Sequence, residues 1–273
     1  MNAPQSSRLP TYFVSHGGGP WPWMMDLMPG KNDKLLAGLR RVPAEVGRPR
    51  AILAISGHWE EPEFTVQTSE RPPMIYDYGG FPPHTYRIQY RAPGAPDVAA
   101  RAGQLLDDAG ITVRYDAHRG YDHGTFVPFH VMYPEADVPI VQLSMRHGYD
   151  PEAHLAVGRA LAPLRSEGVL IVGSGSSYHN LRMLGAAGTH PSREFGAWLT
   201  AAVVGASGAE RSRLLAGWQS APSFRAAHPQ EDHLVPLLVA VGAAEDEAAE
   251  TIYHEPDYMG VIESSSYRIG EAP

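Results

Sequence analysis

The chain has 273 residues, of which 43% are apolar, and this length suits one large domain with a full hydrophobic core. Its 22 basic residues are outnumbered by 30 acidic ones and form no dense cluster, so the formal charge of -8 argues against a nucleic-acid or anionic-membrane surface. There are no cysteines, which excludes disulfides, thiolate metal ligands and a cysteine nucleophile.

Strand-like and helix-like segments alternate along the chain, and this alternation predicts an α/β fold with a mixed or largely parallel sheet. Apolar runs predict strands at 11–15, 51–57, 64–68, 111–115, 138–143 and 169–177, and late strands at 251–254 and 259–267. Helical spacing and helix-end signals predict helices at 33–41, 96–109, 151–164, 193–204 and 231–241. Glycines and prolines mark a turn at 17–20 and a long loop at 72–83. We expect a single domain over 1–273.

Three histidines each follow one of the predicted buried strands directly. His16 follows the run at 11–15, His58 follows 51–57 and His179 follows 169–177. In an open α/β sheet, ligands gather beyond the carboxyl ends of the strands, so these imidazoles can converge on one point. Convergent imidazoles suggest a metal, and His233, in the opening turns of the predicted helix at 231–241, can complete the ligand set.

The segment before the last predicted helix offers two histidines and two acids. Pro229 suits the first helical position, and Glu231 and Asp232 place negative charge in the first turn. Residues five apart on a helix point roughly 140° away from each other, so His228 and His233 cannot both bind one metal. We therefore expect one to bind and the other to support it. Adjacent helical residues diverge by about 100°, so a ligating His233 turns Asp232 away.

A fifth candidate, His123, lies between Asp122 and a glycine at the start of an apolar stretch. Asp122 could orient or charge this imidazole, or the histidine could simply tie down a loop. The residues alone leave both interpretations open.

Motifs of other enzyme classes are incomplete. The glycines at 17–19 are not followed by the Lys-Ser/Thr pair of a P-loop, and Gly173-Ser-Gly lacks the third glycine of a dinucleotide fingerprint because Tyr178 occupies that position. No H-E-x-x-H pattern supports a zincin protease. The glycine pair of a serine-hydrolase elbow is missing around Ser56, Ser174, Ser176 and Ser177.

Six motifs in chain order resemble one enzyme family. They are Ser15-His16-Gly-Gly-Gly-Pro20, Ser56-Gly-His58-Trp59-Glu60, Tyr76-Asp-Tyr-Gly-Gly-Phe81-Pro82, Asp122-His123-Gly124 with Val127-Pro128, Gly173-Ser-Gly with His179-Asn180-Leu181, and His228-Pro-x-x-Asp-His233-Leu-x-Pro-Leu237. Together they resemble the LigB-type class III extradiol ring-cleavage dioxygenases, in the DOPA 4,5-dioxygenase-like branch. The resemblance covers the chain from residue 16 to at least 242.

The resemblance implies one three-layer α/β/α domain with a mixed, largely parallel central sheet, and an enzyme that opens catechol-type rings with O2 at a non-haem ferrous ion. By matching positions, His16, His58 and His233 are the expected metal ligands. His179 matches the acid/base histidine, and His123 matches a second active-site histidine that contacts substrate or oxygen. We expect His228 and Asp122 to support this set.

The third ligand departs from one branch of the family. Protocatechuate-type relatives have a glutamate there, whereas three neutral imidazoles leave the metal its full dipositive charge. Imidazole suits Zn(II) as well as Fe(II), so we expect Fe(II) for activity and allow for Zn(II) in an isolated protein.

Two other functions remain open on the sequence: a Memo-like metal-binding or interaction protein without catalysis, and a zinc-dependent hydrolase. The expected partners are a small-molecule catechol and O2, with no nucleic acid and no membrane, and a homo-oligomer remains open. No signal-peptide core precedes residue 11 and no apolar stretch spans a bilayer, so we expect a cytoplasmic protein. Aromatic side chains either wall a ring pocket or merely pack a loop, and arginines are candidates for a ring substituent: Trp59, Tyr76, Tyr78, Phe81 and His84, and Arg87, Arg146 and Arg182.

Overall fold

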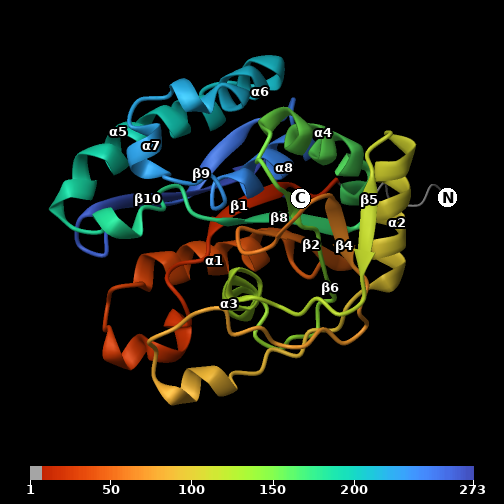
Figure 1. The fold of residues 1–273 in the computed structure, drawn as a ribbon, viewed down its shortest axis with the longest axis horizontal. Helices are drawn as coiled ribbons and strands as arrows, with labels where there is room; N and C mark the ends of the chain where they lie inside the picture. Colours follow the sequence, from red (N-terminus) through yellow and green to blue (C-terminus); the bar gives the residue numbers. More distant parts are fainter. Residues whose placement is uncertain (1–7) are drawn as a thin grey trace.

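A six-stranded sheet forms the centre of the protein in the computed structural model, which describes residues 8–273 (Figure 1). The strand order is β6-β2-β8-β1-β10-β9. The first four strands in this order run parallel, and β10 runs antiparallel to both of its neighbours, β1 and β9. The predicted mixed, largely parallel sheet is confirmed. In the order of the sheet, the strands are β6 (Ile140–Gln142), β2 (Ala51–Ser56), β8 (Val169–Gly175), β1 (Thr11–Ser15), β10 (Ile262–Ile269) and β9 (Ala249–Tyr258).

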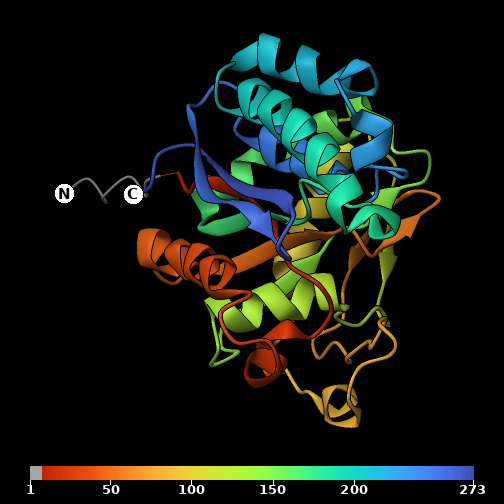
Figure 2. The same ribbon diagram turned by 90° about the vertical axis from the view of Figure 1, so that its left-hand side faces the viewer.

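Helices cover both faces of this sheet, so the elements form three layers (Figure 2). One face carries α1 (Asp33–Val46) and α3 (His123–Met132), and the other carries α4 (Pro151–Leu161), α5 (Ala186–Val203) and α8 (Val235–Ala243). The remaining elements are η1 (Trp21–Leu27), β3 (Glu60–Glu61), β4 (Phe64–Gln67), η2 (Pro83–Arg87), α2 (Pro96–Asp108), β5 (Val113–Asp116), β7 (Met145–Arg146), η3 (Ala162–Glu167), η4 (Leu181–Met183), α6 (Gly208–Ala216), η5 (Trp218–Ser220) and α7 (Phe224–Ala227).

The central strands are buried on both faces, as their sequences require. Every residue of β1, β2 and β8 is buried, and their unbroken apolar character is typical of strands covered by helices on each side. All residues of α8 are also buried, since this helix packs between β8 and α4. The sheet therefore provides a rigid base for the groups at its edge. Within residues 8–273, no helix is both long and apolar enough to cross a membrane.

Two of the differences from the predicted helices have identifiable physical reasons. Helix α3 was not predicted, because nine of its ten residues are buried and it shows no one-sided apolar pattern. The last helix begins at Val235 rather than at 231, because Pro236, not Pro229, occupies its first turn. The strands predicted at 64–68 and 111–115 form a separate two-stranded sheet as β4 and β5.

Candidate metal centre

The carboxyl ends of three neighbouring strands bring five histidines into one cluster. His16 follows β1, His58 comes two residues after β2, and His179 comes four residues after β8. Because these strands are hydrogen-bonded neighbours in the order β2-β8-β1, the segments leave the sheet side by side. His123 is the first residue of α3, and His233 lies just before α8. All five candidate metal-binding and catalytic histidines thus come together.

Nε2 of His58 lies close to the same nitrogen of two other imidazoles. His58 Nε2 lies 3.3 Å from His16 Nε2 and 3.1 Å from His233 Nε2. Two imidazole nitrogens that each lie about 2.1 Å from one cation are roughly 3.0 to 3.4 Å apart at octahedral or tetrahedral angles. The spacing and chemistry of these donors therefore fit a shared transition-metal ion.

More than one triad in the cluster has metal-ligand spacing. The ligand atoms of His16, His58 and His123 lie within 4.8 Å of one another, and so do those of His179, Asp232 and His233. The ring of His179 stacks on that of His233 with centroids 3.3 Å apart, and the ring centroids of His123 and His58 are 4.0 Å apart. The cluster is thus continuous from His123 to His179.

A serine on β8 fixes the tautomer of His16. Ser174 Oγ donates its one proton to the carbonyl oxygen of Gly124, so it can only accept at its 3.1 Å contact with His16 Nδ1. Nδ1 of His16 therefore carries the ring proton. Its Nε2 is left as a bare lone pair facing the cluster, which is the form that binds a metal.

Asp77 faces Nδ1 of two other histidines, as Ser174 does for His16. Its Oδ1 accepts hydrogen bonds from Nδ1 of His123 at 2.9 Å and from the backbone N–H of the same residue at 3.0 Å. Its Oδ2 lies 3.5 Å from Nδ1 of His58. Asp77 lies within the motif Tyr76-Asp-Tyr-Gly-Gly-Phe81-Pro82, and no role was predicted for it. A carboxylate in a tyrosine- and glycine-rich loop was the available signal, but its imidazole partners are 19 and 46 positions away.

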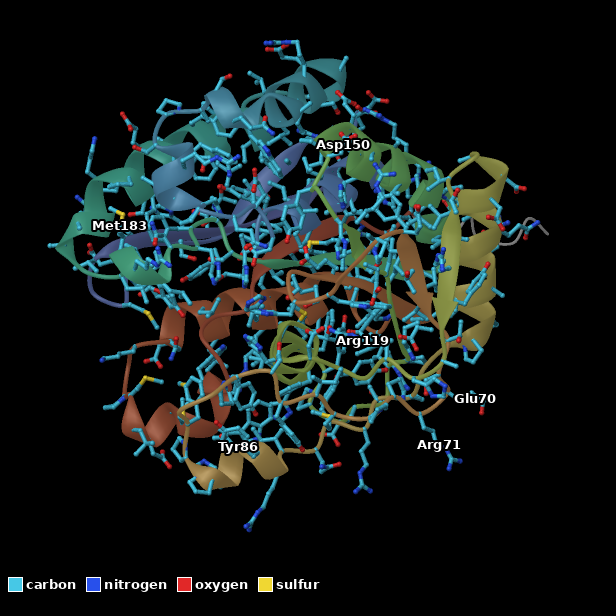
Figure 3. The ribbon with its side chains drawn as sticks, viewed as in Figure 1. Glu70, Arg71, Tyr86, Arg119, Asp150 and Met183 are labelled. Carbon is cyan, nitrogen blue, oxygen red and sulfur yellow. The ribbon has the colours of Figure 1, made fainter. Side chains whose placement is uncertain are left out.

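Asp122 supports the site differently from the sequence expectation. It caps α3, accepting from the backbone N–H of Thr125 at 3.0 Å, and it also accepts from Ser56 Oγ at 2.7 Å. Arg119, labelled in Figure 3, donates to Asp122 and, at 3.2 Å, to the carbonyl oxygen of His58. The sequence left open whether Asp122 orients the ring of His123; in the structure its carboxylate faces the amides at the start of α3, and Asp77 contacts that ring. Asp122 holds the chain around His58.

The later start of α8 changes the position of Asp232. Because residues 229–234 form turns, Asp232 Oδ2 lies 3.0 Å from Nδ1 of His233, and its Oδ1 lies 4.0 Å from Nδ1 of His179. The prediction that Asp232 turns away from the cluster is therefore wrong. His228 lies outside the cluster, fully buried, and its Nε2 donates to the carbonyl oxygen of Ser177 at 3.0 Å, just before His179.

Two glycines at the end of β8 allow the chain around His233 to reach the cluster. A Cβ atom on Gly175 would collide with the carbonyl oxygen of His233, and one on Gly173 with that of Pro236. The backbone N–H of Ser176 donates to the His233 carbonyl at 2.9 Å. The Gly173-Ser-Gly pattern thus provides room for a crossing chain segment.

Burial keeps the clustered imidazoles neutral. Desolvation, followed by repulsion between neighbouring imidazoles, holds the pKa values of His16 and His233 well below the usual range. Burial also lowers the pKa values of His58 and His179. At neutral pH these rings therefore offer lone pairs rather than positive charge, as metal binding requires.

The cluster opens to solvent between an aromatic side and a polar hollow. On the aromatic side, the ring centroid of Tyr78 lies 5.8 Å from that of His123 and 5.4 Å from that of Phe81. On the other side, His179 and Asp232 line a hollow of about 490 Å³. Of the three candidate arginines, Arg182 lines this hollow, whereas Arg146 lies over the ring of Phe64.

Comparison with known proteins identifies the family. Residues 11–270 match the model of the catalytic LigB subunit of aromatic ring-opening dioxygenase. The chain belongs to the LigB family. It is 38% identical over 267 residues to a 4,5-DOPA dioxygenase extradiol of Beta vulgaris, covering 94% of this chain and 95% of the relative. It is 32% identical to the protein of the same name in Escherichia coli K12, with 97% and 96% covered.

A fungal relative and a solved structure extend the LigB assignment. Dioxygenase tasH of Hapsidospora irregularis is 39% identical, with 92% of this chain and 83% of the relative covered. The crystal structure of an uncharacterized protein from Escherichia coli K12 superposes with a TM-score of 0.78 at 28% identity, covering 96% of this chain and 100% of that one. The LigB-family chain is an aromatic ring-cleaving dioxygenase of the extradiol type.

Proposed function

We propose that this enzyme is a non-haem Fe(II)-dependent extradiol dioxygenase that opens a catechol-type ring with O2. The single observation that carries the proposal is the convergence of Nε2 of His58 with Nε2 of His16 and His233, at 3.3 and 3.1 Å. Relatives named 4,5-DOPA dioxygenase extradiol make DOPA the first catechol to test.

The three converging nitrogens are the proposed metal ligands. His16, His58 and His233 would hold the ion through Nε2, because their Nδ1 atoms face Ser174, Asp77 and Asp232 respectively. A ferrous ion bound there supplies positions at which a catechol and O2 can be held side by side. Neutral imidazoles also bind Zn(II), so a protein isolated without added iron can carry zinc.

His179 is the proposed acid/base group. It stacks on His233 and its side chain is 26% exposed, so it faces the opening of the cluster. Burial lowers its pKa, which leaves the ring neutral and able to accept a proton from a catechol hydroxyl. His123 keeps a bare Nε2, because its Nδ1 donates to Asp77, and it can accept a hydrogen bond from the substrate.

Anaerobic loading with Fe(II), followed by O2 and a panel of catechols including DOPA, tests the proposal. We expect a yellow ring-opened product with one O2 consumed per ring, and no turnover with Zn(II). His179→Ala should bind iron as the wild type does but lose turnover. If iron is bound at the histidines and no catechol is cleaved, the proposal is wrong. Turnover of an ester or amide without O2 would instead support a zinc hydrolase.

A further inference from the structure

We infer that Asp77 is a positioning residue that fixes the tautomers of two active-site histidines at once, His123 through Oδ1 and His58 through Oδ2. The inference rests on the proposed function, because it assigns His58 Nε2 to the metal. It concerns the site's capacity to bind a metal, which can be measured without turnover.

The contacts of Asp77 leave each ring one tautomer. A carboxyl group is ordinarily ionised at neutral pH, and a carboxylate only accepts. Oδ1 accepts from both N–H groups of His123, which places the ring proton of His123 on Nδ1. Oδ2 lies 3.5 Å from Nδ1 of His58, and its negative charge favours a proton on that nitrogen. Both Nε2 atoms are then bare.

The other acids of the site do not share this arrangement. The carboxylate oxygens of Asp122 accept hydrogen bonds from Ser56, Thr125 and Arg119. Asp232 lies 3.0 Å from Nδ1 of His233 and 4.0 Å from Nδ1 of His179, but the buried Nδ1 of His233 has no hydrogen bond. Within the described part of the chain, Asp77 is the carboxylate that accepts a hydrogen bond from one imidazole of the cluster and also faces a second one.

An amide at position 77 would reverse one of these tautomers. In Asp77→Asn, the amide oxygen can keep both hydrogen bonds from His123, which turns the new NH2 toward Nδ1 of His58. The opposite orientation would set that NH2 against two donors. Facing a donor, His58 Nδ1 becomes an acceptor and the ring proton moves to Nε2. A protonated Nε2 cannot bind a cation.

The test measures metal affinity in two variants whose order separates the tautomer model from a structural role. We expect Zn(II) and Fe(II) to bind Asp77→Asn about 10- to 100-fold more weakly than wild type. Asp77→Ala, which leaves His58 free to adopt either tautomer, should lose less affinity. If Asp77 only braces the loop, the isosteric asparagine should be the milder change, and that order would overturn the inference.

A second readout follows the ring protons directly. Nitrogen NMR of the metal-free protein should show His58 protonated at Nδ1 in wild type and at Nε2 in Asp77→Asn, and an unchanged tautomer would also overturn the inference. Asp150→Asn is the matched control, because Asp150 caps α4, its side chain is not bonded to any of the five clustered histidines, and asparagine caps equally well. Its metal affinity should equal that of wild type. Failure of catechol cleavage alone would count against the proposed function and not against this inference.

Discussion

Buried polar side chains lie at both ends of the central sheet, and the two groups use their hydrogen bonds differently. At the amino end, Arg165 is fully buried, and all three of its guanidinium nitrogens donate: to the carbonyl oxygens of Leu9 and Ala243 and to both carboxylate oxygens of Glu247. At the carboxyl end, Nε2 of His58 faces the same atom of His16 and His233. The hydrogen-bond donors of Arg165 are paired within the protein, whereas the imidazole nitrogens of the cluster face one another with their lone pairs.

The difference separates groups that hold the fold together from groups that await a ligand. A protein loses about 3 to 5 kcal/mol of stability when one partner of a buried, paired charge is removed. Facing imidazole nitrogens gain nothing from one another unless a proton or a cation lies between them. Stability and activity should therefore respond to mutation at opposite ends of the sheet.

Removal of a proposed metal ligand should give the largest effect. His58→Ala is expected to lower kcat/KM for a catechol several-thousandfold, or roughly 5 kcal/mol of transition-state stabilisation, because the bound metal supplies most of the electrophilic help. The free energy of unfolding of the metal-free protein should not fall. Steady-state kinetics measure kcat/KM, and urea unfolding measures the free energy of unfolding. A large loss of stability would show that His58 also holds the fold together, as Arg165 does.

Breaking the arginine network should give the reverse result. Arg165→Met leaves two buried carbonyl oxygens without their donor and leaves Glu247 with Arg8 as its partner, so the free energy of unfolding should fall by about 3 kcal/mol. Urea unfolding checks this value. Metal affinity, titrated below the unfolding transition, should match wild type, and a parallel loss of metal would show that the two ends are coupled.

His154 has hydrogen bonds at both ring nitrogens, unlike the clustered histidines, and its effect on stability should depend on pH. Its Nδ1 donates to the Asp150 carbonyl and its Nε2 accepts from the backbone N–H of Arg146, while burial lowers its pKa to about 4. The unfolded chain gains a proton near pH 6.5 and the folded one only near pH 4. The stabilisation is thus complete above pH 6.5 and declines by about 3 kcal/mol toward pH 4.

The measurement is unfolding free energy against pH in His154→Gln. Its slope between pH 6.5 and 4 should be about 1.4 kcal/mol per pH unit smaller than in wild type, the value for one proton. An unchanged slope would mean that His154 does not titrate in this range.

A small side chain placed behind His58 should give the smallest effect. A Cβ on Gly124 would collide with Ser56 Oγ and lie 2.9 Å from Cδ2 of His58. Gly124→Ala should therefore cost about 2 kcal/mol of stability and weaken metal binding by displacing the ring. Calorimetry measures the change in stability, and metal titration measures the change in metal affinity. Loss of stability with intact metal affinity would show that His58 can shift without consequence.

The parts of the site that follow strands could be predicted from sequence, and the parts contributed by loops could not. His16, His58 and His179 follow apolar runs, and the carboxyl edge of a parallel sheet is a common meeting point for such residues. Asp77 acts on His58 and His123, which are distant in sequence, and Arg119 reaches the carbonyl oxygen of His58 from 61 positions away, so local sequence does not reveal either contact. The position of Asp232 depended on which of two prolines begins α8, which the pattern of charges did not decide.

The backbone of the segment that carries His233 packs directly against Gly173 and Gly175, so the end of β8 fixes the distance of the His233 imidazole from the sheet. Any side chain at either position would lift that crossing, and a displacement of about 1 Å is enough to impair a reacting geometry. By contrast, a Cβ atom on Gly79, next to Tyr78 in the aromatic loop, would meet no atom within 4 Å. A side chain added there can therefore change the aromatic side of the site while the spacing of the imidazoles stays constant.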